Sequence, residues 1–269
     1  MKTDRNVSQR DYLRFVRGNV LAWTPAEEVA VESAWAGLEP KLTEMLLPFP
    51  EKIYFVKTTG AEEGDQEYTR ANALIFPESA LAAAKLPSLK ATIAHELFHV
   101  LSRNAPELRD ELYAVIGFRP CGEVPFPPAL VSRRITDPDA PRNDHCILVQ
   151  TDTGPAWTVP ILFSKAVHYD VAKGGQFFQY AQLKLLVVQR AGDSPSATAH
   201  YDPANVRLLD VDQVHGFYEQ VGRNTNYTIH PEEILADNFR LLLLGEADVR
   251  SPEVLQNLAT ALKHSQGKQ

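Results

Sequence analysis

Apolar residues recur every three to four positions in six stretches of the chain, which is the spacing of amphipathic helices. The first stretch, residues 25–47, directly follows Thr24, a residue type that caps helix N-termini. The stretch at 89–103 lies between a Pro-Ser start signal and a break that contains proline. Further helices are expected at residues 107–116, 211–221, 231–244 and 252–263.

Five shorter stretches are rich in β-branched and aromatic residues and predict strands at 52–57, 68–76, 146–151, 157–164 and 176–189. Pro and Gly cluster at 120–128 and again at 137–141, between the early helices and the later strands. We therefore expect an α+β fold in which residues 1–269 form one domain. A β-rich insertion at about 121–210 would separate its two helical segments.

The overall composition is that of an ordinary globular protein, with 44% apolar and 23% charged residues. A net charge of -7 argues against nucleic acid or an anionic membrane as the main partner. No apolar run is long enough to span a bilayer, and the N-terminus lacks the apolar core of a secretory signal. We expect a cytoplasmic protein in which Cys121 and Cys146 are free thiols; a bridge between them would require an oxidising compartment.

The candidate chemistry lies in the second predicted helix, where residues 95–99 have the sequence His-Glu-Leu-Phe-His. Positions four apart share a helix face, so His95 and His99 can bind one metal ion together. Glu96 lies about 100° round the helix from His95, within reach of a water on that ion. The apolar residues of the helix form a stripe on the opposite side. The alternative is a chance motif, with two histidines on a solvated face and no metal.

The residue types indicate catalytic rather than structural zinc. Catalytic Zn²⁺ keeps an open position for water beside three protein ligands, whereas structural zinc favours four ligands with sulfur. No Cys lies near the motif, and Glu96 is a suitable general base for such a water.

The segment His95-Glu96-Leu97-Phe98-His99 resembles the signature of the zincin metallopeptidases. The form with a third histidine does not fit, because Ser and Ala occupy positions 102 and 105, where that form has Gly and His. The gluzincin branch is more similar: its third ligand is a glutamate on a later helix, with an aspartate four residues on. This resemblance implies a zincin-like fold, with Glu233 as the third ligand. It also implies that Asp237 accepts a hydrogen bond from a ligand histidine and fixes its tautomer.

Other acidic residues remain candidates for the third ligand. Pro and Glu are also preferred at any helix start, so at least one of Glu232 and Glu233 is expected there for that reason alone. Glu123 has the shorter gap typical of thermolysin-like enzymes, but it lies among Gly and Pro residues. The candidates that are closer in sequence are Glu107, Asp110 and Glu111.

The resemblance also implies a substrate strand and an oxyanion donor. The segment Ala71-Asn72-Ala73-Leu74-Ile75-Phe76, in the strand predicted before the motif helix, would be an edge strand to which a peptide substrate adds. An ordinary sheet strand would have the same sequence pattern. Tyr227 or His230 would donate a hydrogen bond to the oxyanion. Tyr218 and His215 are weaker candidates, and packing or capping is the more common role for each of the four taken individually.

The expected function is therefore zinc-dependent hydrolysis of peptide bonds in a peptide or protein substrate, with Glu96 as general base. One alternative is a zinc hydrolase of a non-peptide amide or ester. Another is a catalytically inactive module that holds zinc for binding or scaffolding. The sequence leaves open the natural substrate, endo- versus exopeptidase action and the oligomeric state.

Overall fold

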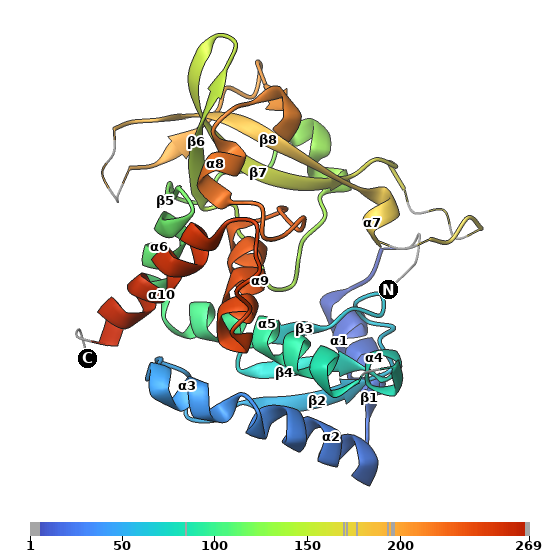
Figure 1. The fold of residues 1–269 in the computed structure, drawn as a ribbon. Helices are drawn as coiled ribbons and strands as arrows, with labels where there is room; N and C mark the ends of the chain where they lie inside the picture. The colour runs from blue at the N-terminus through green and yellow to red at the C-terminus, as the bar shows by residue number, and fades with distance from the viewer. Residues whose placement is uncertain are drawn as a thin grey trace.

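The computed structural model shows a mixed α+β protein that contains two β-sheets (Figure 1). The structure describes residues 6–83, 85–168, 170, 172–175, 177–192, 194 and 197–266. Within these ranges, no helix combines the length and the apolar character needed to cross a membrane.

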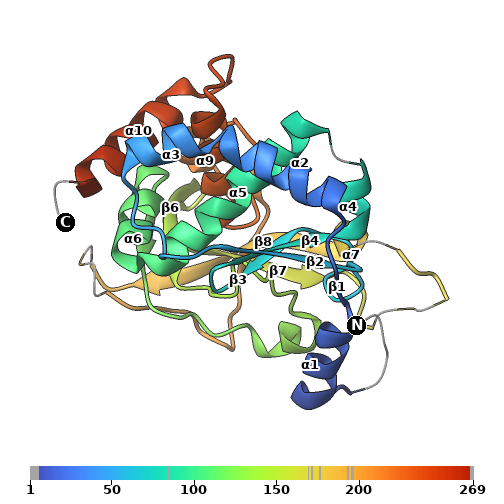
Figure 2. The same cartoon turned by 90° about the horizontal axis from the view of Figure 1, so that it is seen from below.

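The N-terminal sheet has four strands in the order β1-β2-β4-β3. Strands β2 and β4 are parallel, and the other two pairings are antiparallel. Helices α2 and α5 cover one face of this sheet (Figure 2). The elements of this part are α1 (Gln9–Gly18), β1 (Val20–Leu21), α2 (Pro25–Ala36), α3 (Glu39–Met45), β2 (Tyr54–Thr58), β3 (Tyr68–Arg70), β4 (Ala73–Pro77), α4 (Glu78–Ala83), α5 (Leu86–Asn104) and α6 (Pro106–Val115).

A second, antiparallel sheet is built from the region that was predicted to be β-rich. Its strand order is β10-β8-β7-β6-β5, and β9 pairs with β8 outside this path. The elements are β5 (Phe118–Pro120), η1 (Pro128–Arg133), β6 (His145–Thr151), β7 (Gly154–Ser164), α7 (Phe177–Tyr180), β8 (Ala181–Arg190), β9 (Ala199–His200) and β10 (Leu208–Leu209).

The chain then returns to the helical part through η2 (Val211–Gln213), α8 (Phe217–Val221), α9 (Pro231–Leu244) and α10 (Pro252–Gln266). Helix α9 packs directly against α5, and both lie between the two sheets (Figure 1). One hydrophobic core joins these helices to both sheets; it includes Phe76 from β4, Phe98 from α5, Ile147 from β6 and Phe239 from α9. The packing of α5 on α9 therefore sets the geometry at the centre of the molecule.

Several predicted elements proved to be divided. The helix at 25–47 is two helices, α2 and α3, because Pro40 has no N–H to donate to the carbonyl of Ala36, where α2 ends, and its ring would clash with that carbonyl. The strand at 68–76 is the β3–β4 hairpin, which turns at Ala71 with a positive φ of 52°. The helix at 211–221 is interrupted before α8 by Gly216, whose φ is 83°. The stretch at 176–189 begins with α7 before β8 starts, and α1 had not been predicted.

Candidate metal centre

Helix α5 presents its two motif histidines toward α9 while its apolar face packs into the core. Leu97 and Leu101 are completely buried on the core side. His95 keeps 18% of its side chain exposed, whereas His99 keeps only 1%. The two rings lie edge to face, with centroids 4.9 Å apart. The motif thus forms one wall of a largely enclosed site.

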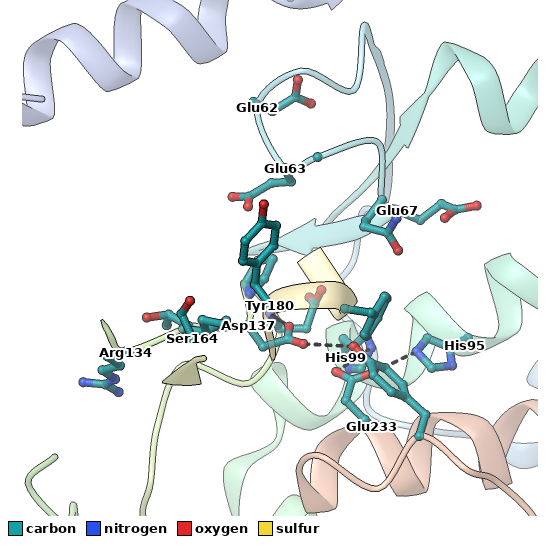
Figure 3. A pocket seen from close by; sticks show the side chains of 18 of the residues that line it. Glu62, Glu63, Glu67, His95, His99, Arg134, Asp137, Ser164, Tyr180 and Glu233 are labelled. Atoms are coloured by element: carbon teal, nitrogen blue, oxygen red, sulfur yellow. Dashed lines mark hydrogen bonds and ion pairs between the residues drawn. The ribbon is translucent and has the colours of Figure 1, made fainter. Parts of the chain in front are cut away.

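Glu233, in the first turn of α9, faces the same ring nitrogen of both histidines. Its Oε2 lies 3.2 Å from His95 Nε2, and its Oε1 lies 3.7 Å from His99 Nε2. One ligand atom from each of these residues lies within 4.8 Å of the other two. Figure 3 shows the three side chains converging from the two helices. They form a group that can hold one metal ion.

The other ring nitrogens point away from this group, each toward a carboxylate of α9. His95 Nδ1 lies 3.2 Å from Asp237 Oδ1, and His99 Nδ1 lies 2.9 Å from Glu232 Oε1. Thr225 donates its hydroxyl to Asp237. The structure therefore places Asp237 where the resemblance predicted a supporting aspartate. It also reveals Glu232, which the sequence had suggested only as a helix-start residue or an alternative ligand.

The charges of the group stabilise one another. Burial lowers the pKa of His95, but its hydrogen bonds to Asp237 and Glu233 outweigh burial and raise that pKa to about 10. Burial is likewise outweighed for His99, whose pKa is raised by the charge of Glu233. Burial raises the pKa of Asp237, but the contact with His95 holds it at about 2. In the protein without metal, protons on the histidines thus balance the carboxylates.

Glu96 lies beside the histidines with one carboxylate oxygen unoccupied. Its side chain is 4% exposed, and its Oε2 has no hydrogen-bond partner among the described residues. Burial, followed by the charge of Asp139, raises the pKa of Glu96 to about 8. A buried carboxylate with a free oxygen next to a metal-ligand group is placed to bind or deprotonate a small molecule.

The group opens into a cavity of about 1040 Å³. One wall is the loop at residues 61–67, which carries Glu62, Glu63 and Glu67 (Figure 3). Further lining comes from the second sheet and its connections, at residues 132–139, 164–168 and 178–180. Both sheets therefore shape the space in front of the histidines.

Two aspartates of the loop after η1, Asp137 and Asp139, also line the cavity. The sequence indicated only a Pro-containing loop at this position and gave no sign that these residues belong to the site. Asp137 accepts a hydrogen bond from the Tyr227 hydroxyl at 3.3 Å. Burial and the charges of Glu233 and Asp139 raise the pKa of Asp137 to about 7. Asp139 forms a second possible ligand group with Glu96 and His99.

That second group is less suited to a cation. Asp139 already accepts the Thr69 backbone N–H at 3.0 Å and forms an ion pair with Arg103 at 3.2 Å. The guanidinium thus supplies the positive charge that an ion would otherwise bring. His99 belongs to both groups. In the group with His95 and Glu233, the Nε2 atoms of both histidines are directed at the Glu233 carboxylate.

The predicted substrate strand is not an edge strand, which corrects the proposed role of Ala71, Asn72 and Ala73. Strand β4 lies between β2 and β3, so both of its sides are already paired. None of the three residues lines the cavity. The hairpin at Ala71 folds β3 onto β4, and β3 becomes the edge of the sheet. On that edge, the N–H of Thr69 is already bound to Asp139.

The two candidate oxyanion donors differ in position. Tyr227 lines the cavity. His230 instead caps α9: its Nδ1 accepts the Glu232 backbone N–H at 3.1 Å, and its Nε2 lies 3.0 Å from the Arg142 carbonyl oxygen. Both ring nitrogens of His230 are thereby occupied outside the main cavity. The structure gives His230 the capping role that was the alternative from the sequence.

The remaining candidates lie elsewhere. Tyr218, His215, Glu107, Glu111 and Glu123 do not line the cavity. His215 forms a β-bridge with Gln150, and Glu123 is near Arg142. Cys121 and Cys146 are buried free thiols in the hydrophobic core of the second sheet, and neither lines the cavity.

Comparisons with protein-family models, with curated proteins and with solved structures found no match to this chain.

Proposed function

We propose that this protein is a zinc-dependent metallopeptidase with a zincin-like fold of the gluzincin type. One observation carries the proposal: the Nε2 atoms of His95 and His99 both face the carboxylate of Glu233, beside the free oxygen of Glu96. Two imidazole nitrogens and one carboxylate are a ligand set used by catalytic zinc, which keeps its fourth position open.

The chemistry of the donor set fits a cation at this point. In the protein without metal, protons on the histidine nitrogens occupy the space between them and Glu233. A divalent ion would replace those protons and neutralise the same carboxylate. The Nδ1 contacts to Asp237 and Glu232 would persist, because they lie on the far side of each ring.

When bound, Zn²⁺ would lower the pKa of a water molecule and polarise the substrate carbonyl. Glu96 would accept the proton of the attacking water and pass it to the leaving amine. Burial raises the pKa of Glu96 to about 8 in the metal-free protein, so its carboxylate is a stronger base than that of an exposed glutamate. The charge of a nearby cation would favour the carboxylate, which is the form that accepts the proton.

Tyr227 is the candidate donor to the oxyanion. Burial and the charge of Glu233 raise the pKa of its hydroxyl well above 10, so the hydroxyl keeps its proton. In the structure it donates that proton to Asp137. Rotation from Asp137 to a substrate oxygen would stabilise the charge that develops during attack on a carbonyl.

The cavity favours a peptide over a very small substrate, because it extends between two sheets and encloses about 1040 Å³. A hydrolase of another amide or ester is the nearest alternative, since it would need the same metal group and base. An inactive zinc-holding module is less well supported, because the free oxygen of Glu96 would have no use in it.

Metal analysis and a peptidase assay test the proposal together. Purified protein should contain about one zinc per chain, and it should cleave members of a mixed peptide library that is analysed by mass spectrometry. Glu96→Gln keeps the size of the side chain but removes its basicity. We expect this variant to retain zinc and to lose hydrolysis by a factor of about 10² or more.

Each outcome separates the alternatives. Zinc without cleavage of peptides, but with cleavage of ester or amide probes, would support the non-peptide hydrolase. Zinc with no hydrolysis at all would support the inactive module. Wild-type cleavage by Glu96→Gln would disprove the assignment of the base.

A further inference from the structure

Glu232, the residue before the candidate ligand Glu233, is buried against the second motif histidine. Its side chain is 2% exposed. Its Oε1 accepts from His99 Nδ1 at 2.9 Å and from the Ser102 hydroxyl at 2.5 Å. Its Oε2 accepts the hydroxyl proton of Tyr113. Both oxygens of this carboxylate are therefore held in place by α5 and α6.

Helix geometry explains why one helix can serve both histidines. His95 and His99 are one turn apart, a rise of about 6 Å, and Glu232 and Asp237 are separated by a rise of about 7.5 Å. Because His95 meets Asp237 and His99 meets Glu232, α5 and α9 run antiparallel at this point. Glu233 lies between these two contacts and faces both Nε2 atoms.

A helix-start preference alone does not account for this arrangement. A carboxylate that serves only the helix dipole can remain in water, whereas burial of a carboxylate is strongly unfavourable unless it is well partnered. The backbone N–H of Glu232 is already satisfied by His230. The Glu232 side chain turns away from its own helix and meets three donors on α5 and α6.

We propose that Glu232 is a positioning residue for the metal ligand His99, equivalent to Asp237 for His95. By accepting the Nδ1 proton, Glu232 fixes the tautomer whose Nε2 lone pair is directed at the metal position, and it makes the imidazole a stronger ligand. Tyr113 and Ser102 hold the carboxylate in line with the ring. The inference rests on the proposed metal site. It assigns each ligand histidine of α5 a carboxylate partner, and both partners lie on α9.

The chain offers a matched control. Helices α9 and α10 both begin with Pro-Glu, so Glu253 occupies in α10 the position that Glu232 occupies in α9. Glu253 is exposed. Glu253→Gln thus removes a helix-start charge without touching a histidine, and Glu232→Gln removes the same charge from behind His99. Asp237→Asn provides the comparison at His95.

The decisive measurement is the zinc dissociation constant of each folded, metal-free variant, obtained by competition with a chromogenic chelator. We expect Glu232→Gln and Asp237→Asn each to weaken zinc binding by about 10- to 100-fold, and Glu253→Gln to leave it unchanged. Equal affinity of Glu232→Gln and wild type would overturn this inference while leaving the proposed function intact. Failure of the wild type to bind zinc would overturn both.

A second measurement applies if Glu232→Gln does not fold. Nitrogen-15 NMR of histidine-labelled wild-type protein with bound zinc should show that His99 carries its proton on Nδ1 and bonds zinc through Nε2. Zinc on Nδ1 of His99 would overturn the proposal, because that nitrogen is the one assigned to Glu232.

Discussion

His95 Nε2 lies 3.2 Å from Glu233 Oε2, although 138 positions separate the two residues in the chain. The second sheet occupies most of that interval, and α9 returns beside α5 only after it. The contact is maintained by the packing of these two helices around Phe98 and Phe239. The geometry of the candidate site therefore depends on the core of the whole molecule.

Replacement of Glu233 should reduce zinc affinity more than replacement of either supporting carboxylate, because it removes a ligand. We expect Glu233→Ala to lose zinc during dialysis against a mild chelator that leaves the wild type loaded. Zinc content measured by atomic absorption checks this result. Circular dichroism of the variant provides the control for folding. Retention of zinc at the wild-type level would exclude Glu233 as a ligand.

Tyr227→Phe should affect the catalytic rate, whereas His230→Ala should affect the stability of the fold. Loss of an oxyanion donor lowers kcat by about 10²- to 10³-fold with little change in KM, so this is the expectation for Tyr227→Phe. Loss of a helix cap costs about 1 kcal/mol of stability, which is the expectation for His230→Ala, with kcat preserved. Steady-state kinetics and urea unfolding of both variants distinguish the two roles. A wild-type kcat for Tyr227→Phe would remove it from the mechanism.

Zinc binding should release protons at neutral pH. The pKa of His95 is about 10 in the metal-free protein, and that of His99 is also raised, so both rings are protonated before zinc binds. Each must lose its Nε2 proton to become a ligand, so we expect release of at least about two protons per zinc. Calorimetry in buffers with different ionisation enthalpies measures this number. A binding enthalpy independent of the buffer would contradict it.

The stability of the metal-free protein should be greatest in mildly acidic solution. Protonated His95 contributes fully below its unfolded pKa of about 6.5, and this contribution is lost as pH rises through about 10. Ionised Asp237 contributes above about pH 3.9, and its contribution is lost as pH falls toward 2. Urea unfolding of chelator-treated protein across this range tests the profile. His95→Gln should flatten the alkaline limb, and an unchanged slope between pH 7 and 10 would refute the assignment.

The core between the two helices should be costly to disturb. Phe239 is completely buried and packs on Phe98 with ring centroids 5.7 Å apart. Phe239→Ala is expected to lower the free energy of unfolding by about 3–5 kcal/mol. Val29 is 61% exposed, so Val29→Ala provides a control with little expected effect. Urea unfolding measures both, and a loss below about 1 kcal/mol for Phe239→Ala would contradict the packing described.

Features that depend on local geometry could be predicted from the amino-acid sequence. Backbone hydrogen bonds in a helix join residues four apart, so the spacing of His95 and His99 was sufficient to place them on one face. Helix α9 has the bounds predicted from its apolar period and its proline start. The mixed α+β character also followed from the two periodicities. Local signals were weaker where a helix or strand was interrupted, as at Pro40 and Ala71.

Contacts between residues that are distant in the chain could not be predicted in the same way, because they depend on how the helices and sheets pack. Glu233 was suggested by resemblance, but its contact with both histidines depends on the antiparallel packing of α9 on α5. In the sequence, Glu232 could not be distinguished from an ordinary helix-start residue, although its side chain contacts His99. Asp137 could not be distinguished from an ordinary loop residue, although it lines the cavity. The substrate strand was misassigned because strand pairing decides whether a strand is an edge, and that pairing is made by residues outside it. Burial and pairing are properties of the folded chain, because they depend on what the other elements bring to the same place.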